Sequence, residues 1–341
     1  MLITRQSEGC VSTMRYYATL GPACADPLII DQMIKAGING FRVNLSHGHL
    51  EDFVPWMDMV RRVAAGRDCE LLIDLQGPDL RVGELEAPLS LPEGSVLTLG
   101  LGGVYCSELL LDALTPGQKL VFDDGQVVAQ VASVSPGCAF CVVQQGGVLQ
   151  SGKGITAPGL KLDLPTLTLE DHNSLALAKH LGVTGVILPF VRSRDDLDNL
   201  RDAMYSCGAG DLRVFAKVES LEGVEHLAQF VDLADEIIIA RGDLASEIPL
   251  WLIPRFQKQM GEVCLSNGVP YMVVTQLLES MTDHPLPTRA EMSDIYNAVM
   301  DGASSLMLTG ETAVGLYPAQ AAEYLVKAAQ PALEDRPKPT I

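Results

Sequence analysis

The feature that most constrains this chain is an alternation of short apolar segments with stretches of helical periodicity. The apolar segments are 16–20, 40–45, 70–75, 185–190, 212–218, 236–240, 270–274 and 304–308. Short apolar runs between turn signals are typical of buried strands, and strands that alternate with helices form parallel sheets. Eight such units predict an α/β fold, a (β/α)8 or TIM barrel, instead of an open doubly wound sheet. The glycine-rich sequences of Rossmann and P-loop nucleotide sites do not occur.

The helical rhythm stops between residues 84 and 160. Short alternating segments replace it at 95–99, 119–122, 126–134 and 139–143, with Gly, Pro and Asp turns between them. We therefore expect a small inserted β-barrel lid domain at 84–160, after the third strand, and a catalytic barrel made of 1–83 and 161–341. A last helix is expected at 319–330, followed by a polar tail and by no second large domain.

Composition limits the classes of partner. The formal charge of −19 argues against nucleic acid, so we expect no such partner. An anionic substrate would then need a local group of Lys and Arg, or a metal. No apolar run reaches the ~18 residues of a membrane span, and the N-terminus lacks the apolar core of a signal peptide. With cysteines scattered through apolar segments, we expect a cytoplasmic protein that does not bind membranes.

Charged and polar side chains stand at or just after the ends of most predicted strands, where packing gives no reason for them. In a barrel these ends converge on the face that carries active sites. They are Arg42, Asn44, Asp74, Lys217, Glu219, Arg241, Asp243, Thr275 and Glu311.

The pairing of these residues indicates the chemistry. Lys217 and Glu219 are two apart and so share a face of one strand. Glu219 and Asp243, on adjacent strands, suit Mg²⁺ completed by substrate phosphate and water, while Arg42 and Lys217 supply charge for a phosphoryl group. This combination predicts phosphoryl or enolate chemistry, with Thr275 or a nearby water as proton donor. Each residue alone could instead form a rim salt bridge; the whole set is harder to explain that way.

At these residues the chain resembles the pyruvate kinase family over about residues 15–330. The similar segments occur in the family's order along the chain. They are Thr19–Ala23, Arg42–Gly48, Asp74–Gly83, Lys153–Gly159, Asp163–Pro165, Lys217–Glu219, Ala240–Leu244, Thr275–Gln276, Pro287–Glu291 and Leu308–Thr312.

The resemblance implies glycolytic transfer of a phosphoryl group from phosphoenolpyruvate to ADP, giving pyruvate and ATP. It implies Lys217, Arg42 and Thr275 as catalytic residues. Substrate would be bound by Arg42, Lys217, Gly242, Asp243 and Thr275, and Mg²⁺ or Mn²⁺ by Glu219 and Asp243. A homo-dimer through barrel helices is a further expectation.

The resemblance also implies a potassium site and a nucleotide site. Potassium would be bound by Asn44, Ser46, Asp74 and the backbone carbonyl of Leu75. The nucleotide phosphates would be bound by Arg81, Lys153, His47 and Asn44.

The chain departs from the family pattern at Leu75-Gln76, where Thr-Lys is usual, so the positive potential of the site is expected to be weaker. We also expect no C-terminal regulatory domain and no control by phosphosugars. Two alternatives stay open: a related phosphoenolpyruvate or pyruvate enzyme acting as a lyase or on another acceptor, and a non-catalytic homologue that binds a ligand or partner. Retention of Arg81 and Lys153 argues against the first, and retention of Lys217, Glu219, Asp243 and Thr275 against the second.

Overall fold

A computed structural model describes residues 14–78, 80–160, 162 and 164–336. Within them, eight parallel strands form a closed barrel in the order β1-β15-β14-β13-β12-β11-β3-β2, which confirms the predicted (β/α)8 barrel. Their bounds are β1 (Arg15–Thr19), β2 (Gly40–Asn44), β3 (Glu70–Asp74), β11 (Gly185–Leu188), β12 (Arg213–Val218), β13 (Glu236–Ala240), β14 (Tyr271–Val274) and β15 (Ser305–Leu308).

Helices connect these strands. They are α1 (Pro27–Ala36), α2 (Val54–Val63), α4 (Leu169–Ala178), α5 (Arg194–Ser206), α6 (Leu221–Phe230), α7 (Arg241–Glu247), α8 (Ile253–Ser266), α9 (Arg289–Met300), α10 (Gly310–Ala313) and α11 (Pro318–Asp335). No helix in the described ranges is both long and apolar enough to cross a bilayer.

Local signals set the ends of α1. The side chain of Asp26 caps the first turn by accepting a hydrogen bond from the Leu28 amide at 2.7 Å, and proline occupies the first helical position. Gly37, at φ +122°, ends the helix in a conformation that favours glycine.

The predicted polar tail after residue 330 is wrong in its first part. Helix α11 continues through Pro331 to Asp335. Ala329 and Ala332 on this helix are fully buried, so the packed face continues past the proline and compensates for its missing amide hydrogen bond.

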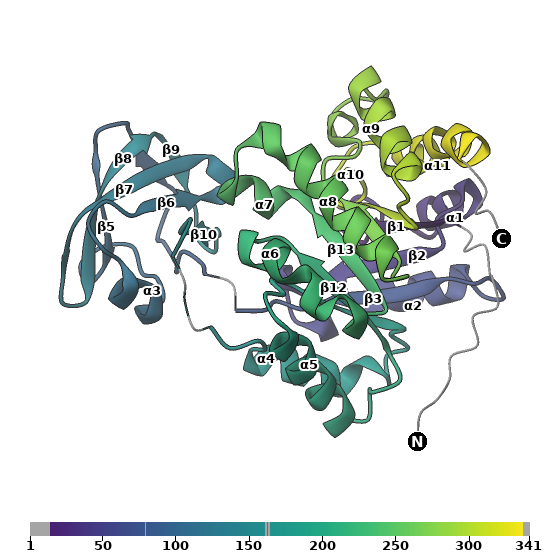
Figure 1. Ribbon diagram of the computed structural model, residues 1–341, viewed down its shortest axis with the longest axis horizontal. Coiled ribbons are helices and arrows are strands. Elements are labelled where there is room, and N and C mark those ends of the chain that lie inside the picture. The colour runs from purple at the N-terminus through teal and green to yellow at the C-terminus, as the bar shows by residue number, and fades with distance from the viewer. Residues whose placement is uncertain (1–13, 79, 161, 163, 337–341) are drawn as a thin grey trace. The chain divides into compact units, whose positions relative to one another are not determined.

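The inserted segment forms two antiparallel sheets, with strand orders β10-β6-β7-β8-β5 and β4-β9 (Figure 1). It also contains a short helix, α3 (Glu108–Ala113), which the sequence interpretation missed. The strands are β4 (Leu89–Leu91), β5 (Val96–Gly100), β6 (Lys119–Phe122), β7 (Val127–Ser135), β8 (Cys138–Gln145), β9 (Gly147–Leu149) and β10 (Ile155–Thr156).

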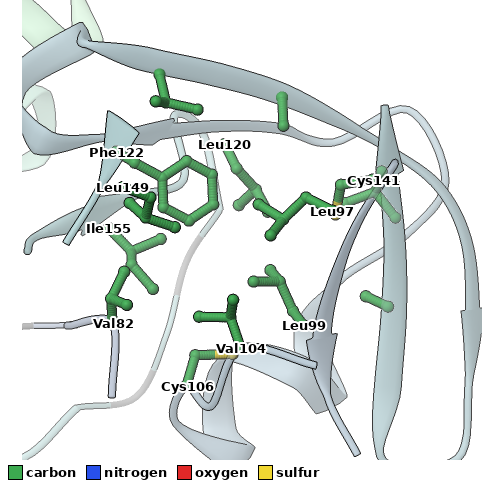
Figure 2. Close-up of a cluster of buried hydrophobic side chains, with 14 of the residues drawn as sticks. Val82, Leu97, Leu99, Val104, Cys106, Leu120, Phe122, Cys141, Leu149 and Ile155 are labelled. Carbon is green, nitrogen blue, oxygen red and sulfur yellow. The ribbon is translucent and has the colours of Figure 1, made fainter. Parts of the chain in front are cut away.

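This segment has a hydrophobic core of its own. Figure 2 shows Phe122, Leu120, Leu97 and Ile155 gathered in it, all almost or fully excluded from solvent. Every buried member of the cluster falls between residues 82 and 155. A separate core is what an inserted domain requires; the boundaries 84–160 themselves stay a prediction.

By internal contacts the chain divides into two compact units. The first comprises residues up to 43, 55–71 and 270 onward, and the second comprises 44–54 and 72–269. Most of the predicted site residues belong to the second unit, whereas Arg42 and Thr275 belong to the first.

Candidate active site

A buried ion cluster lies at the end of β12 in the second unit. Nζ of Lys217 is 3.2 Å from Oε2 of Glu219 and 3.6 Å from Oδ2 of Asp74, which ends β3. The Lys217 side chain is 15% exposed, that of Asp74 1% and that of Glu219 0%. The shared face expected from the spacing of Lys217 and Glu219 is therefore present, and Asp74 joins it.

Glu219 has the most unusual environment of the three. Its Oε1 accepts a hydrogen bond from the Phe190 amide at 2.8 Å, while Oε2, beside the Lys217 ammonium, accepts none of good geometry from the residues described. Burial raises the pKa of Glu219 well above its usual value, Lys217 opposes this, and the carboxylates of Asp243 and Asp74 raise it further. The positive charge of Lys217 thus does not offset the effect of burial on the Glu219 carboxyl.

Asp243 is not on a strand, contrary to the interpretation that it closes the sixth. Strand β13 ends at Ala240, and Asp243 lies in the first turn of α7, directly after Gly242. Arg241 and Leu244 are both buried, and their spacing of three residues fits one face of a helix, which explains why the chain coils here. Asp243 still lies near enough to Glu219 to raise the pKa of that carboxyl.

The residues present fit a divalent cation. Mg²⁺ binds proteins through one or two carboxylates and takes its other ligands from substrate phosphate and water, and Glu219 and Asp243 form such a pair. No group of three or more His, Cys, Asp or Glu that could hold a metal occurs among the described residues, so an all-protein cage, as for structural zinc, does not fit.

Oxygen donors of the predicted potassium site come from two segments of the second unit. Asn44 ends β2, and its Oδ1 accepts a hydrogen bond from the Ser46 amide at 3.2 Å at the start of η1 (Leu45–His47). Asp74 ends β3 and Leu75 follows it, with the Leu75 amide bonded to the Ile187 carbonyl. Carboxylate, amide, hydroxyl and carbonyl oxygens are hard donors, which fit a cation such as K⁺. His47 lies in the same turn as Ser46.

Arg81 and Lys153, predicted to contact nucleotide, lie on neighbouring antiparallel segments although 72 positions separate them in the sequence. Arg81 forms a β-bridge with Gly154, and its guanidinium donates to the Gly152 carbonyl at 2.7 Å. Nζ of Lys153 is 2.9 Å from Oδ1 of Asp123, in the turn after β6. The sequence did not indicate this ion pair, because an aspartate between two predicted strands is typical of a turn.

The first unit holds Arg42 and Thr275. Arg42, in β2, is 7% exposed and donates to Oγ1 of Thr19 at 3.1 Å. Thr275 follows β14 with φ +68°, and the next residue, Gln276, has φ +53°. A left-handed conformation is costly for a β-branched residue, and such strain is often found at functional sites.

Glu311, another polar residue near a strand end, has a structural role. It is fully buried, and it accepts hydrogen bonds from the amides of Leu278 and Thr309. These bonds tie the loop after β14 to the loop after β15.

Phe190 is a site residue that the sequence did not indicate. It follows β11 in a left-handed conformation, φ +53°, and its amide holds Glu219. Its ring centroid lies 5.9 Å from Nζ of Lys217, within cation–π range. An apolar residue after an apolar strand carries no charge signal, so only the geometry shows this role.

The fold and the cluster define a class: a (β/α)8 barrel protein with a cation–carboxylate centre suited to an anionic substrate and a divalent metal. The family pattern described as "Pyruvate kinase, barrel domain" matches residues 12–322, which covers most of the chain. The chain belongs to the pyruvate kinase family.

Curated relatives agree with this assignment. The chain is 33% identical over 339 residues to "Pyruvate kinase" of Aeropyrum pernix, with 96% of this chain and 74% of the relative covered. It is 34% identical over 334 residues to that of Geobacillus stearothermophilus, covering 93% and 57%. For the Mycobacterium tuberculosis protein (strain H37Rv) the identity is 37% over 312 residues, covering 88% and 66%. The chain therefore spans between about half and three quarters of the length of these relatives.

Proposed function

We propose that this protein transfers the phosphoryl group of phosphoenolpyruvate to ADP, giving pyruvate and ATP. The observation that carries the proposal is the cluster of Lys217 with the buried Asp74 and Glu219, next to Asp243. It combines a cation for a transferring phosphate with a carboxylate pair for Mg²⁺. Named relatives across most of the chain support the same reaction.

Lys217 and Arg42 would hold the phosphate of phosphoenolpyruvate, with the Gly242 backbone, Asp243 and Thr275 at its carboxylate end. Mg²⁺ or Mn²⁺, held by Glu219 and Asp243, would neutralise substrate oxygens when bound. The bond from phosphorus to the enol oxygen breaks, and a bond forms to the terminal phosphate oxygen of ADP. The electron pair of the enolate then takes a proton at the methylene carbon, from Thr275 or a water beside it, and pyruvate results.

The remaining residues would bind the nucleotide and a second cation. Arg81 and Lys153 would contact the ADP phosphates from the proposed lid at 84–160, with His47 and Asn44 on the barrel side. K⁺ would be held by Asn44, Ser46, Asp74 and the Leu75 carbonyl. The proposal includes a cytoplasmic location and a homo-dimer through barrel helices.

A coupled assay tests the reaction. Purified protein with phosphoenolpyruvate, ADP and Mg²⁺ should form pyruvate and ATP in equal amounts, at rates compared with and without K⁺. The same reaction without ADP tests for a lyase or hydrolase activity. Pyruvate formed without ATP would favour the related-enzyme alternative, and no turnover with any nucleoside diphosphate would refute the proposal.

A further inference from the structure

The link between β3 and the inserted segment is held by one buried carboxylate on another element. Asp171, in the first turn of α4, is 1% exposed. Its Oδ1 accepts from the Gln76 amide at 2.8 Å, and its Oδ2 accepts from the Gly77 amide at 3.2 Å. Oδ2 also accepts from the amide and the hydroxyl of Thr168, each at 2.8 Å. Only the bonds from Thr168 cap the helix. The bonds from Gln76 and Gly77 come from residues 94 or more positions away along the chain.

The bond to the Gln76 amide fixes a carbonyl as well. The Gln76 N–H and the Leu75 C=O belong to one peptide unit, which is planar and trans, so the two groups point in opposite directions. By binding the N–H, Asp171 directs the Leu75 carbonyl oxygen away from itself. A charged acceptor on the N–H also polarises the peptide and strengthens that oxygen as a ligand.

The side chain of Gln76 holds the other segment of the same site. Its Nε2 donates to the Leu45 carbonyl at 2.9 Å, in the turn between Asn44 and Ser46. One residue therefore ties the turn after β2 to the end of β3, with its own backbone fixed by Asp171. The oxygens of Asn44, Ser46 and Leu75 lie on the two segments so joined.

We propose that Asp171 and Gln76 are positioning residues that build the monovalent-cation site: Asp171 orients the Leu75 carbonyl, and Gln76 holds the Asn44–Ser46 turn beside it. This inference rests on the proposed function, which places K⁺ at these oxygens. Neither residue would contact the ion. Both act through the ligands, as residues behind metal ligands commonly do.

Two variants test the proposal. In Asp171→Asn the side chain keeps a single acceptor oxygen. That oxygen cannot accept from the Gln76 amide, the Gly77 amide and the two Thr168 donors at the same time. In Gln76→Leu the donor to the Leu45 carbonyl is lost while Asp171 keeps its bonds. Gln76→Lys retains a donor at this position and serves as the conservative rescue.

Asp196→Asn is the matched control. Asp196 occupies the same capping position on α5, is 5% exposed, and accepts from Ser193, Arg192 and Thr166 but not from residue 76. It undergoes the same chemical change at a similarly buried site, so it measures the general cost of losing a capping carboxylate.

Two readouts are needed, one of them independent of turnover. The first is the increase in melting temperature with KCl, compared with choline chloride at equal ionic strength. The second is the K⁺ concentration for half-maximal activity. Asp171→Asn and Gln76→Leu should raise the half-maximal K⁺ concentration about 10-fold or more in both readouts. Gln76→Lys and Asp196→Asn should stay within about 2-fold of the unmodified protein, well below that effect.

Unchanged K⁺ constants in Asp171→Asn and Gln76→Leu would overturn the proposal, and so would an equal shift in Asp196→Asn. If Asp171→Asn does not fold, the comparison of Gln76→Leu with Gln76→Lys decides the outcome. An unmodified protein that responds to K⁺ in neither readout would refute the cation site and this inference with it. That failure is distinct from failure of phosphoryl transfer, which the coupled assay measures separately.

Discussion

Replacing Lys217 by Met should destabilise the protein as well as inactivate it. The ammonium lies 3.2 Å from a Glu219 oxygen and 3.6 Å from an Asp74 oxygen, so at an effective dielectric constant of about 20 each attraction is worth roughly 5 kcal/mol before desolvation. Methionine fills a similar volume but leaves two buried carboxylates without their cation. Removing one partner of such a cluster costs about 3–5 kcal/mol, and we expect a loss of this size.

Urea denaturation measures the loss, and the coupled assay measures kcat, which should fall about 100-fold or more. Mg²⁺ should restore more stability to Lys217→Met than it adds to the unmodified protein, because it then replaces the positive charge that the Lys217 ammonium supplied. Lys179→Met is the control: Lys179 pairs with Asp211 at 2.8 Å, but both side chains are more than half exposed, so little or no loss of stability is expected. Equal losses in the two variants, or an unchanged kcat in Lys217→Met, would refute the reasoning.

Three further predictions concern the core of the inserted segment, the proposed nucleotide contact and the effect of pH. Phe122→Ala, in the core of the inserted segment shown in Figure 2, should lower the free energy of unfolding by about 3–5 kcal/mol in urea; a loss under about 1 kcal/mol would contradict its burial. Lys153→Met should raise KM for ADP several-fold with little change in KM for phosphoenolpyruvate, and equal rises would contradict a nucleotide role. The hydrogen bond to Glu170 raises the pKa of His49, so this pair stabilises the fold fully below about pH 6.5 and loses its effect as pH rises through the raised value. The melting temperature of His49→Gln should therefore fall further below that of the unmodified protein at about pH 5.5 than at about pH 9, and a gap independent of pH would refute this.

Features encoded by neighbouring residues were predictable from the sequence. Helix α1 begins and ends where Asp26, Pro27 and Gly37 indicate, and β13 has the expected bounds. The shared face of Lys217 and Glu219 follows from the two-residue period of a strand. Each of these needs only a few consecutive residues, so periodicity and capping chemistry are sufficient.

Features that depend on distant partners were not predictable. Phe190 contributes to the site through a backbone amide, which every non-proline residue has. The bonds from the Gln76 and Gly77 amides to Asp171 form only once α4 and the end of β3 are adjacent, and no local sequence signal at Asp171 indicates them. Helix α11 passes Pro331 because its buried face continues, whereas the local signal favours a stop.

The change from Thr-Lys to Leu75-Gln76 is tolerable for two separate reasons. Leu75 would offer K⁺ its backbone carbonyl, so its side chain is free to pack, and it is 1% exposed. Gln76 retains a donor for the Leu45 carbonyl, so the geometric contribution of a lysine is kept and only its charge is lost. With that charge absent, no lysine at position 76 adds to the positive charge of Lys217 beside the carboxylates of Asp74 and Glu219. A divalent cation held by Glu219 and Asp243 would supply positive charge in place of the lysine, and substrate affinity in this chain should therefore depend more steeply on Mg²⁺ than in a relative that keeps the lysine.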